Sequence, residues 1–236
     1  MPQPQPDSHS RAGARTDVAA TGGERVPAAL VIACGALARE IAALRRINGW
    51  AALDVQCLPP ELHNHPEQIP ARVRAAIIAA RPRYSTIFVA YGDCGTGGQL
   101  DAVLRAEGVE RLPGAHCYEV FATASQFAQL CEAELGTFYL TDFLVRHFDR
   151  LVVGTLGIDI HPELTAEYFR HYRRVVYLVQ VHSEPLVAAA RKIALRLGLE
   201  FKVQVTGYGD LAGSLAAVHE RSRVVHKPHA APIRGA

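Results

Sequence analysis

The chain of 236 residues lacks any long apolar run, and none approaches the roughly 20 residues that a membrane-spanning helix needs. The first 26 residues also lack the apolar stretch of about 7–15 residues that a secretory signal carries. Charge of one sign is not in excess either, since the formal net charge is +2. Net charge therefore gives no reason to expect a nucleic-acid or membrane partner. We expect a cytoplasmic protein.

Cysteine is scarce, and its count of five is odd. An odd number fits a reduced protein better than a framework of disulfides. The pairs at Cys-x-x-Cys spacing that would make a zinc site a firm prediction are absent. Any metal site would therefore depend on residues that are far apart in the sequence.

Short β-branched runs alternate with longer helical patterns between residues 27 and 220. This alternation predicts a single α/β domain with a mostly parallel, Rossmann-like sheet and helices on both faces. Residues 1–26 and 221–236 show no such pattern, and we expect a disordered N-terminal tail and a C-terminal tail. The expected strands are 27–33, 53–57, 86–90, 109–112, 151–153, 175–180 and 201–205, and the expected helices are 37–47, 70–80, 99–106, 118–134, 139–148, 161–172, 185–197 and 211–219.

Four cysteines lie where a predicted strand gives way to a loop or helix: Cys34, Cys57, Cys94 and Cys117. The carboxyl ends of parallel strands share one edge of a sheet, where ligands commonly bind. These thiols are therefore expected to meet in space. Glycine follows both Cys34 and Cys94, and a thiol at a helix start is expected to have a lowered pKa.

Thiolates and imidazoles together are the usual ligands of zinc. His63 follows the second predicted strand, so we predict a zinc site in which Cys34 and Cys94 bind the metal together with His63 or Cys117. Two simpler interpretations stay open: buried free cysteines often serve only in packing, and a loop histidine is often only solvated. A reactive cysteine that works without a metal is a third.

The segment from Tyr91 to Gly98 is rich in glycine but lacks the lysine of a nucleotide-binding phosphate loop. Its amides could still bind the carboxylate or phosphate of a small substrate. The candidate binding residues in turns are Gly35, Gly95, Thr96, Gly97, Gly213 and Ser214. Glu40 and Glu119 are candidate catalytic carboxylates, with a surface ion pair and a helix cap as their respective structural alternatives.

Several of these segments together resemble a widespread bacterial and archaeal family that is known only as a domain of unknown function. The matching residues span about 30–217 and are Ile32 to Leu37 with Glu40, Leu62-His63, Tyr91 to Gly95, the cluster around Cys117, and Gly213-Ser214. Members of this family are often encoded near corrinoid-dependent methyltransferases. The resemblance therefore implies one-carbon or methylamine metabolism as context, with a corrinoid protein or methyltransferase as a partner.

Two functional hypotheses follow. The first is a zinc-dependent enzyme, a methyltransferase, lyase or hydrolase, that acts on a small molecule. The second is a non-catalytic accessory protein that binds a metal, a cobamide or a small molecule. Tyr168, Phe169 and Tyr172 on a polar helix mark either a homo-oligomer interface or partial burial in the core.

Overall fold

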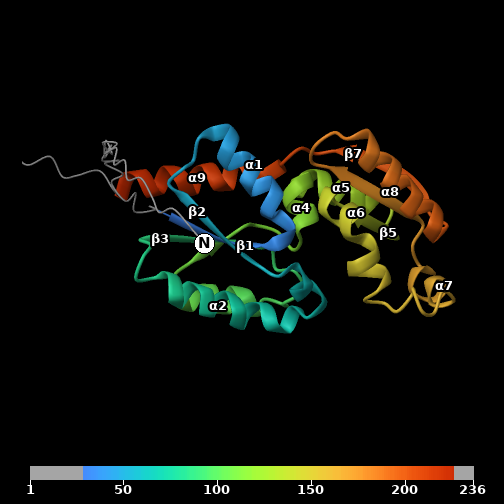
Figure 1. Cartoon of the computed structure of the whole chain (residues 1–236), viewed down its shortest axis with the longest axis horizontal. Helices are drawn as coiled ribbons and strands as arrows, with labels where there is room; N and C mark the ends of the chain where they lie inside the picture. The colour runs from blue at the N-terminus through green and yellow to red at the C-terminus, as the bar shows by residue number, and fades with distance from the viewer. Residues whose placement is uncertain (1–28, 226–236) are drawn as a thin grey trace, which may run out of the picture.

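The computed structural model describes residues 29–225, so the predicted tail 1–26 and most of 221–236 lie outside the described residues. The predicted parallel α/β class is confirmed. However, the strands divide between two separate sheets, one of four strands in the order β2-β1-β3-β4 and one of three in the order β5-β6-β7. The two sheets lie one after the other along the long axis of the molecule (Figure 1). No helix of the described part is long and apolar enough to cross a membrane.

The four-stranded sheet is built around β1 (Ala29–Cys34), whose six residues are all buried. Its parallel neighbours are β2 (Leu53–Leu58) and β3 (Thr86–Ala90), and the short β4 (Glu110–Arg111) pairs with β3. A strand buried on both faces reads as a continuous apolar run rather than an alternating one. The sequence Ala-Leu-Val-Ile-Ala-Cys has that pattern, which is why β1 occupies the centre.

Helices cover both faces of this sheet (Figure 1). Helix α1 (Ala38–Asn48) ends at Gly49, whose left-handed φ of 65° closes the helix. Helix α2 (Ile69–Ala80) begins with a proline in its first turn and packs with α3 (Gln99–Glu107). The last helix, α9 (Gly209–Val225), returns from the second sheet to pack on β1 and β3.

The three-stranded sheet consists of β5 (Thr137–Leu140), β6 (Arg174–Val179) and β7 (Glu200–Val205), all parallel. Alternate residues of β6 enter two separate apolar clusters, Val175, Tyr177 and Val179 in one and Val176 and Leu178 in the other. The first cluster includes residues of α6 (Asp142–Phe148), α7 (Leu164–Phe169) and α8 (Glu184–Leu197). The second includes residues of α5 (Ala124–Ala133). Phe169 is buried in the first cluster, so for this one of the three aromatic residues Tyr168, Phe169 and Tyr172 the core interpretation holds.

The sequence pattern was wrong at three places in this half. Residues 139–148 were expected to be one helix, but β5 ends at Leu140 and α6 begins at Asp142. No glycine or proline marks this junction; instead, the Thr141 hydroxyl accepts a hydrogen bond from the Leu144 amide and caps α6. Residues 151–153 were expected to be extended, but they form a π-helical turn (η4, Asp149–Val153) that continues α6.

The third difference is in the expected helix 118–134, which is two helices, α4 (Cys117–Ala122) and α5. They are separated at Thr123, whose φ is 64°. A β-branched residue is strained in this region, and such positions persist only where surrounding packing holds them. Here Val120 and Phe121 of α4 are buried with the four-stranded sheet, whereas Ala122 belongs to a cluster of the three-stranded sheet. The break therefore lies where the chain passes from one sheet to the other.

Candidate functional site

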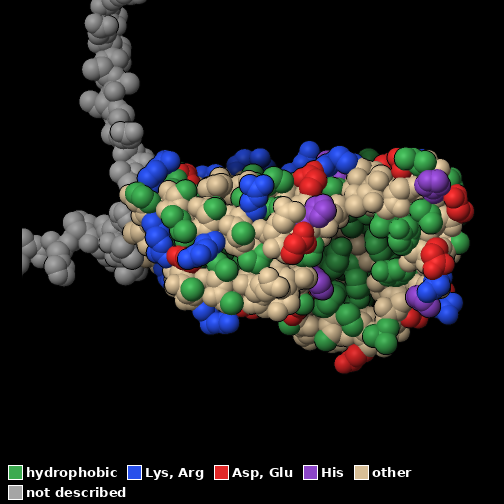
Figure 2. Space-filling model, turned by 90° about the horizontal axis from the view of Figure 1, so that it is seen from below, with side chains coloured by type: hydrophobic (Ala, Val, Ile, Leu, Met, Phe, Trp, Pro, Cys, Tyr) green, Lys and Arg blue, Asp and Glu red, His purple; other side chains and the backbone are tan. Residues whose placement is uncertain are grey.

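A crevice of about 190 Å³ lies between the carboxyl ends of the two sheets. Figure 2 shows the face of the molecule that is hollowed there, with mainly hydrophobic side chains inside the hollow and histidine at its edge. One wall comes from segments that follow β1 and β2 and from the start of α4, and the other from β5, α6 and η4. The lining residues are Ala36, Pro60, His63, Asn64, Cys117, Tyr118, Phe138, Thr141, Phe143, Leu144, Leu151 and Val152.

Cys34 and His63, two of the predicted zinc ligands, lie close together beside this crevice. Cys34 is the last residue of β1, and His63 lies in the short 3-10 helix η2 (Pro60–Asn64) that follows β2. Because β1 and β2 are parallel neighbours with Cys34 opposite Leu58, both side chains arrive at the same edge of the sheet. The Sγ atom of Cys34 is 3.7 Å from Nδ1 of His63.

Cys94 and Cys117 approach the same edge from β3 and α4. The amides of Asp93 and Cys94 donate to the carbonyls of Gly114 and Ala115, over 3.1 and 2.8 Å, which holds the two loops together. Cys94 has a φ of 52°, a conformation that costs a non-glycine residue about 1–2 kcal/mol. Strain of this kind is concentrated at functional sites.

The thiol pKa values are shifted in the direction opposite to the prediction. Burial raises the pKa of Cys34 to about 12 and that of Cys94 to about 11. Burial also raises the pKa of Cys117, and the charges of Cys94 and Cys34 add to this effect. Each of these thiols is thus electrostatically coupled to at least one of the others. Cys34 does cap a helical segment, since the turn η1 (Gly35–Leu37) follows it and the Ala36 amide donates to its sulfur at 3.4 Å and lowers its pKa, but the opposing effect of burial is larger.

His63 is on the solvent side of this group and is exposed as a whole. Protein atoms packed around its ring nevertheless lower its pKa, and the nearby imidazole of His116 lowers it further. A neutral imidazole is the form that binds a metal ion. The direction of this shift therefore suits a ligand role.

Zinc geometry offers a test of these four residues. A tetrahedral zinc ion places a thiolate sulfur and an imidazole nitrogen about 3.5 Å apart, close to the 3.7 Å between Cys34 and His63. Within residues 29–225, however, no three His, Cys, Asp or Glu side chains are already grouped as a metal site. The donor chemistry fits zinc, and one pair has suitable spacing, while Cys94 and Cys117 would have to turn toward that pair.

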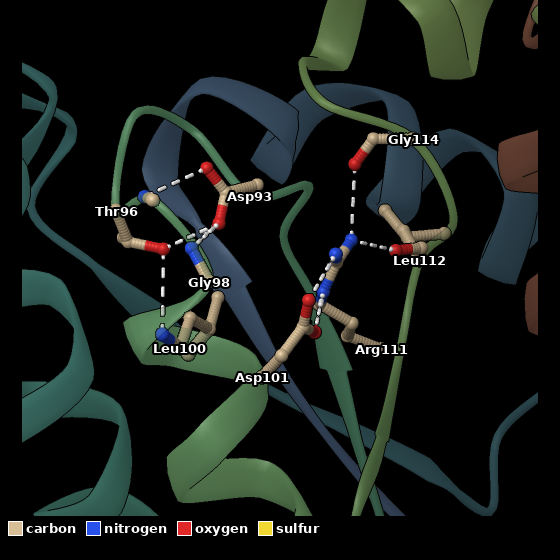
Figure 3. A network of polar contacts seen from close by, with 9 residues as sticks. Asp93, Thr96, Gly98, Leu100, Asp101, Arg111, Leu112 and Gly114 are labelled. Carbon is tan, nitrogen blue, oxygen red and sulfur yellow. Dashed lines mark hydrogen bonds and ion pairs between the residues drawn. The ribbon is translucent and has the colours of Figure 1, made fainter.

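The glycine-rich segment after β3 closes on its own aspartate (Figure 3). The carboxylate of Asp93 accepts hydrogen bonds from the Thr96 hydroxyl at 2.6 Å and from the amides of Gly97 and Gly98 at 3.0 and 2.8 Å. These bonds lower the pKa of Asp93, with the Thr96 hydroxyl as the largest cause. The amides predicted to bind a substrate anion at Gly97 are therefore already occupied, and neither Gly95 nor Thr96 lines the crevice.

The second part of this network joins α3 to the loop that precedes Cys117. Arg111 forms two bonds to Asp101, at 2.6 and 3.0 Å, and donates to the carbonyls of Leu112 and Gly114 (Figure 3). The Gly114 carbonyl also accepts the Asp93 amide. The network thus holds in place the backbone next to Cys94 and the loop just before Cys117.

The two predicted catalytic carboxylates do not line the crevice. Glu119 accepts a hydrogen bond from the Ala115 amide at 2.8 Å, which is a capping interaction at the start of α4. Glu40 is 5% exposed and lies in the first turn of α1, so it is not on a solvent-facing surface. Its Oε2 atom has no hydrogen-bond partner among the described residues. Burial raises its pKa, and Asp142 raises it further.

The turn predicted at Gly213 and Ser214 is wrong, because both residues lie inside helix α9. The glycine that the fold requires is Gly209, at the start of this helix. A Cβ atom there would lie 2.2 Å from the Phe121 carbonyl oxygen and 2.3 Å from that of Val120. A Cβ atom at Gly213 would meet nothing within 4 Å. Gly35, by contrast, is closely packed, since its Cβ would lie 2.9 Å from the Leu58 carbonyl.

Sequence reasoning missed Tyr91 and Asp142. Tyr91 is 1% exposed, and its hydroxyl interacts with the thiol of Cys34 without a hydrogen bond of normal geometry. Asp142 is 1% exposed at the carboxyl end of β5 and accepts from the Tyr177 hydroxyl and from the amides of Gln180 and Val181. The sequence signal for Asp142 was Thr-Asp after an aromatic run, which is typical of a helix start.

A family model described as "Protein of unknown function (DUF1638)" matches residues 57–215. No curated protein and no solved structure matches the chain.

Proposed function

We propose that this chain, which belongs to the DUF1638 family of proteins of unknown function, uses a metal ion to act on a small molecule. The small molecule binds in the crevice between the two sheets. The metal is zinc, which Cys34 and Cys94 would hold together with either His63 or Cys117, so that a fourth position would stay open for the small molecule. The family description gives no reaction, so the proposal depends on the site.

The observation that supports this proposal is the 3.7 Å approach of the Cys34 sulfur to Nδ1 of His63, with Cys94 and Cys117 near enough to Cys34 for the charges of these thiols to act on one another. Three thiols and an imidazole form a ligand set that zinc prefers over magnesium or calcium. Only one of the three thiols, that of Cys117, lines the crevice, together with the ring of His63. A site at this position would face the crevice from one side.

A zinc ion held there would supply Lewis acidity, which activates a bound thiol or polarises a bond of a small substrate. The chain itself contributes a mostly apolar cavity, which excludes water and strengthens electrostatic interactions within it. The Asp93 and Arg111 networks keep the backbone around Cys94 and Cys117 in place. The concrete reaction that we propose is transfer of a methyl group from the cobalt of a corrinoid to the sulfur of a small thiol: the S–C bond forms as the Co–C bond breaks, the cobalt keeps the electron pair of the broken bond, and the thiol gives up its proton.

One observation favours the alternative of a non-catalytic binding protein. The lining residues include no carboxylate, and both Glu40 and Glu119 lie elsewhere. A carrier of a metal, a cobamide or a small molecule needs no general acid or base, whereas most hydrolases need one. An enzyme at this site would have to rely on the metal, and on His63 in the case where Cys117 is the third ligand.

The family resemblance supports a corrinoid-dependent methyl transfer as the first reaction to assay. Methylcobalamin and a small thiol are suitable probes, because transfer of the methyl group changes the corrinoid absorbance. An enzyme should show transfer that the His63→Ala and Cys94→Ser variants abolish and the Glu40→Gln variant retains. A carrier should show none in any variant.

The metal itself is tested by elemental analysis of the full chain purified without a histidine tag. We expect about one zinc per chain, and a loss of most of it in Cys34→Ser and Cys94→Ser. The controls are Cys131→Ser and Cys57→Ser, because Cys131 packs against Tyr139 and Cys57 is exposed. Metal that is substoichiometric in the unmodified chain, or unchanged in the first two variants, would remove the proposal.

A further inference from the structure

The crevice has two unlike walls. Its thiol and imidazole side is formed by His63 and Cys117, whereas the opposite side is formed mainly by Phe138, Phe143, Leu144, Leu151 and Val152. None of the lining residues is an Asp, Glu, Lys or Arg. A charged ligand that enters such a cavity loses its hydration and gains no opposite charge in return, which is strongly unfavourable.

Charged residues do occur at the edge of the crevice, but they form a pair with each other. Glu61, in the same turn as His63, binds Arg150, which precedes Leu151. The Asn64 side chain donates to the Thr155 hydroxyl at 3.1 Å and links the same two segments. Because the charges of Glu61 and Arg150 offset each other, neither is available to a ligand without breaking the pair.

A hydrogen-bond donor is available on the buried side of the crevice. Thr141 is 5% exposed, and its hydroxyl oxygen accepts the Leu144 amide at 3.2 Å. No hydrogen bond among the described residues uses the proton of this hydroxyl, which can therefore be donated to an acceptor on a ligand. The volume of about 190 Å³ corresponds to about six water molecules, which limits the bound part of a ligand to about six to eight non-hydrogen atoms.

We infer that the crevice selects small uncharged molecules that carry a hydrogen-bond acceptor, and that it excludes carboxylates and ammonium ions of the same size. This inference deepens the proposed function, because it names the substrate class of the same site. It does not depend on a metal, since the apolar wall and Thr141 belong to the other side of the crevice.

The test uses three five-membered-ring probes of similar shape: cyclopentanone, cyclopentanecarboxylate and cyclopentylammonium. Each is titrated into the full chain while chemical shifts of crevice residues are followed by NMR, and the zinc content of the same sample is measured. We expect cyclopentanone to bind at least about 10-fold more tightly than either ion, since an unpaired charge in an apolar site costs well over 1.4 kcal/mol.

A charge introduced into the apolar wall should reverse this preference. Leu151 lines the crevice but is not part of the apolar core clusters, so Leu151→Lys is expected to fold and to bind the carboxylate better than the ketone. The matched control is Leu195→Lys, because Leu195 is 81% exposed on α8 and does not line the crevice. This control should keep the original order.

The possible outcomes separate the two proposals. If the ions bind the unmodified chain as well as cyclopentanone does, or if no probe shifts a crevice residue, the substrate class is wrong whatever the zinc content. If cyclopentanone binds selectively in a sample without zinc, the substrate class holds, and only the metal-dependent function fails.

Discussion

Removal of the Asp142 carboxylate should destabilise the wall of the crevice that β5 and α6 form. Asp142 accepts a hydrogen bond from the Tyr177 hydroxyl at 2.7 Å and from the amides of Gln180 and Val181 at 3.2 and 3.1 Å. These bonds tie the carboxyl end of β5 to that of β6. A hydrogen bond to a charged group contributes about 1.5–3 kcal/mol, and a buried donor left without a partner adds a further cost.

The expected cost follows from these three bonds. They are not fully additive, so we expect Asp142→Ala to lower the free energy of unfolding by about 3–5 kcal/mol. For a domain of this size the melting temperature should fall by about 10 °C. Asp142→Asn keeps the shape and one acceptor but places an amide against donors, and its cost should be about 1–3 kcal/mol.

Urea denaturation followed by circular dichroism measures both variants. Asp159→Ala serves as the control because Asp159 is an exposed acidic residue, and its change should stay within about 0.5 kcal/mol. A cost below about 1 kcal/mol for Asp142→Ala would refute the argument, because three bonds to a buried carboxylate could not then hold the two strand ends together.

Two further predictions concern stability. Gly209→Ala should destabilise the chain by at least about 2 kcal/mol, because the φ of Gly209 is 48° and a Cβ atom there would contact the Phe121 carbonyl. Gly213→Ala in the same helix should instead stabilise the chain by about 0.5–1 kcal/mol. Thermal melts in which both variants shift the melting temperature in the same direction would contradict this pair of predictions. The Glu40 carboxyl has a folded-state pKa raised from 4.5 by burial, so its contribution to stability is greatest below the unfolded pKa and is lost as the pH rises through the folded pKa. Relative to Glu40→Gln, the unmodified chain should therefore lose stability between pH 4.5 and neutral pH. Urea titrations at several pH values measure this, and a difference in unfolding free energy between the two proteins that does not change with pH would count against the raised pKa.

The local pattern of apolar residues was sufficient to predict most of the strands and helices. Residues 27–33 were expected to form a strand, which the structure has as β1, and Cys34 and His63 were both expected at the carboxyl edge of a parallel sheet, where they lie 3.7 Å apart. The chain does not indicate, however, that its strands form two sheets. The middle strands of the two sheets, β1 and β6, have the same fully buried apolar pattern, because that pattern records burial and not the identity of the neighbour.

The chemistry of the site was less predictable than its position. A Cys-Gly turn suggested a lowered thiol pKa, but burial raises the pKa of Cys34 and Cys94 instead. The glycine-rich segment suggested an anion site, but the carboxylate of Asp93 already accepts hydrogen bonds from the amides of Gly97 and Gly98. In both cases the outcome depends on atoms that the fold brings close, and a sequence motif does not record them.

The sequence by itself determined the parallel α/β class and most of the strands and helices, and it placed Cys34 and His63 just beyond the ends of strands, because these features follow from local burial and strand direction. Only the tertiary structure decided that a second sheet faces the first across an apolar crevice, that Asp142 ties the far wall together, and that Glu40 and Glu119 lie away from it. The physical reason is range: apolar periodicity acts over a few neighbouring residues, whereas desolvation and hydrogen bonding depend on groups that are distant in the chain.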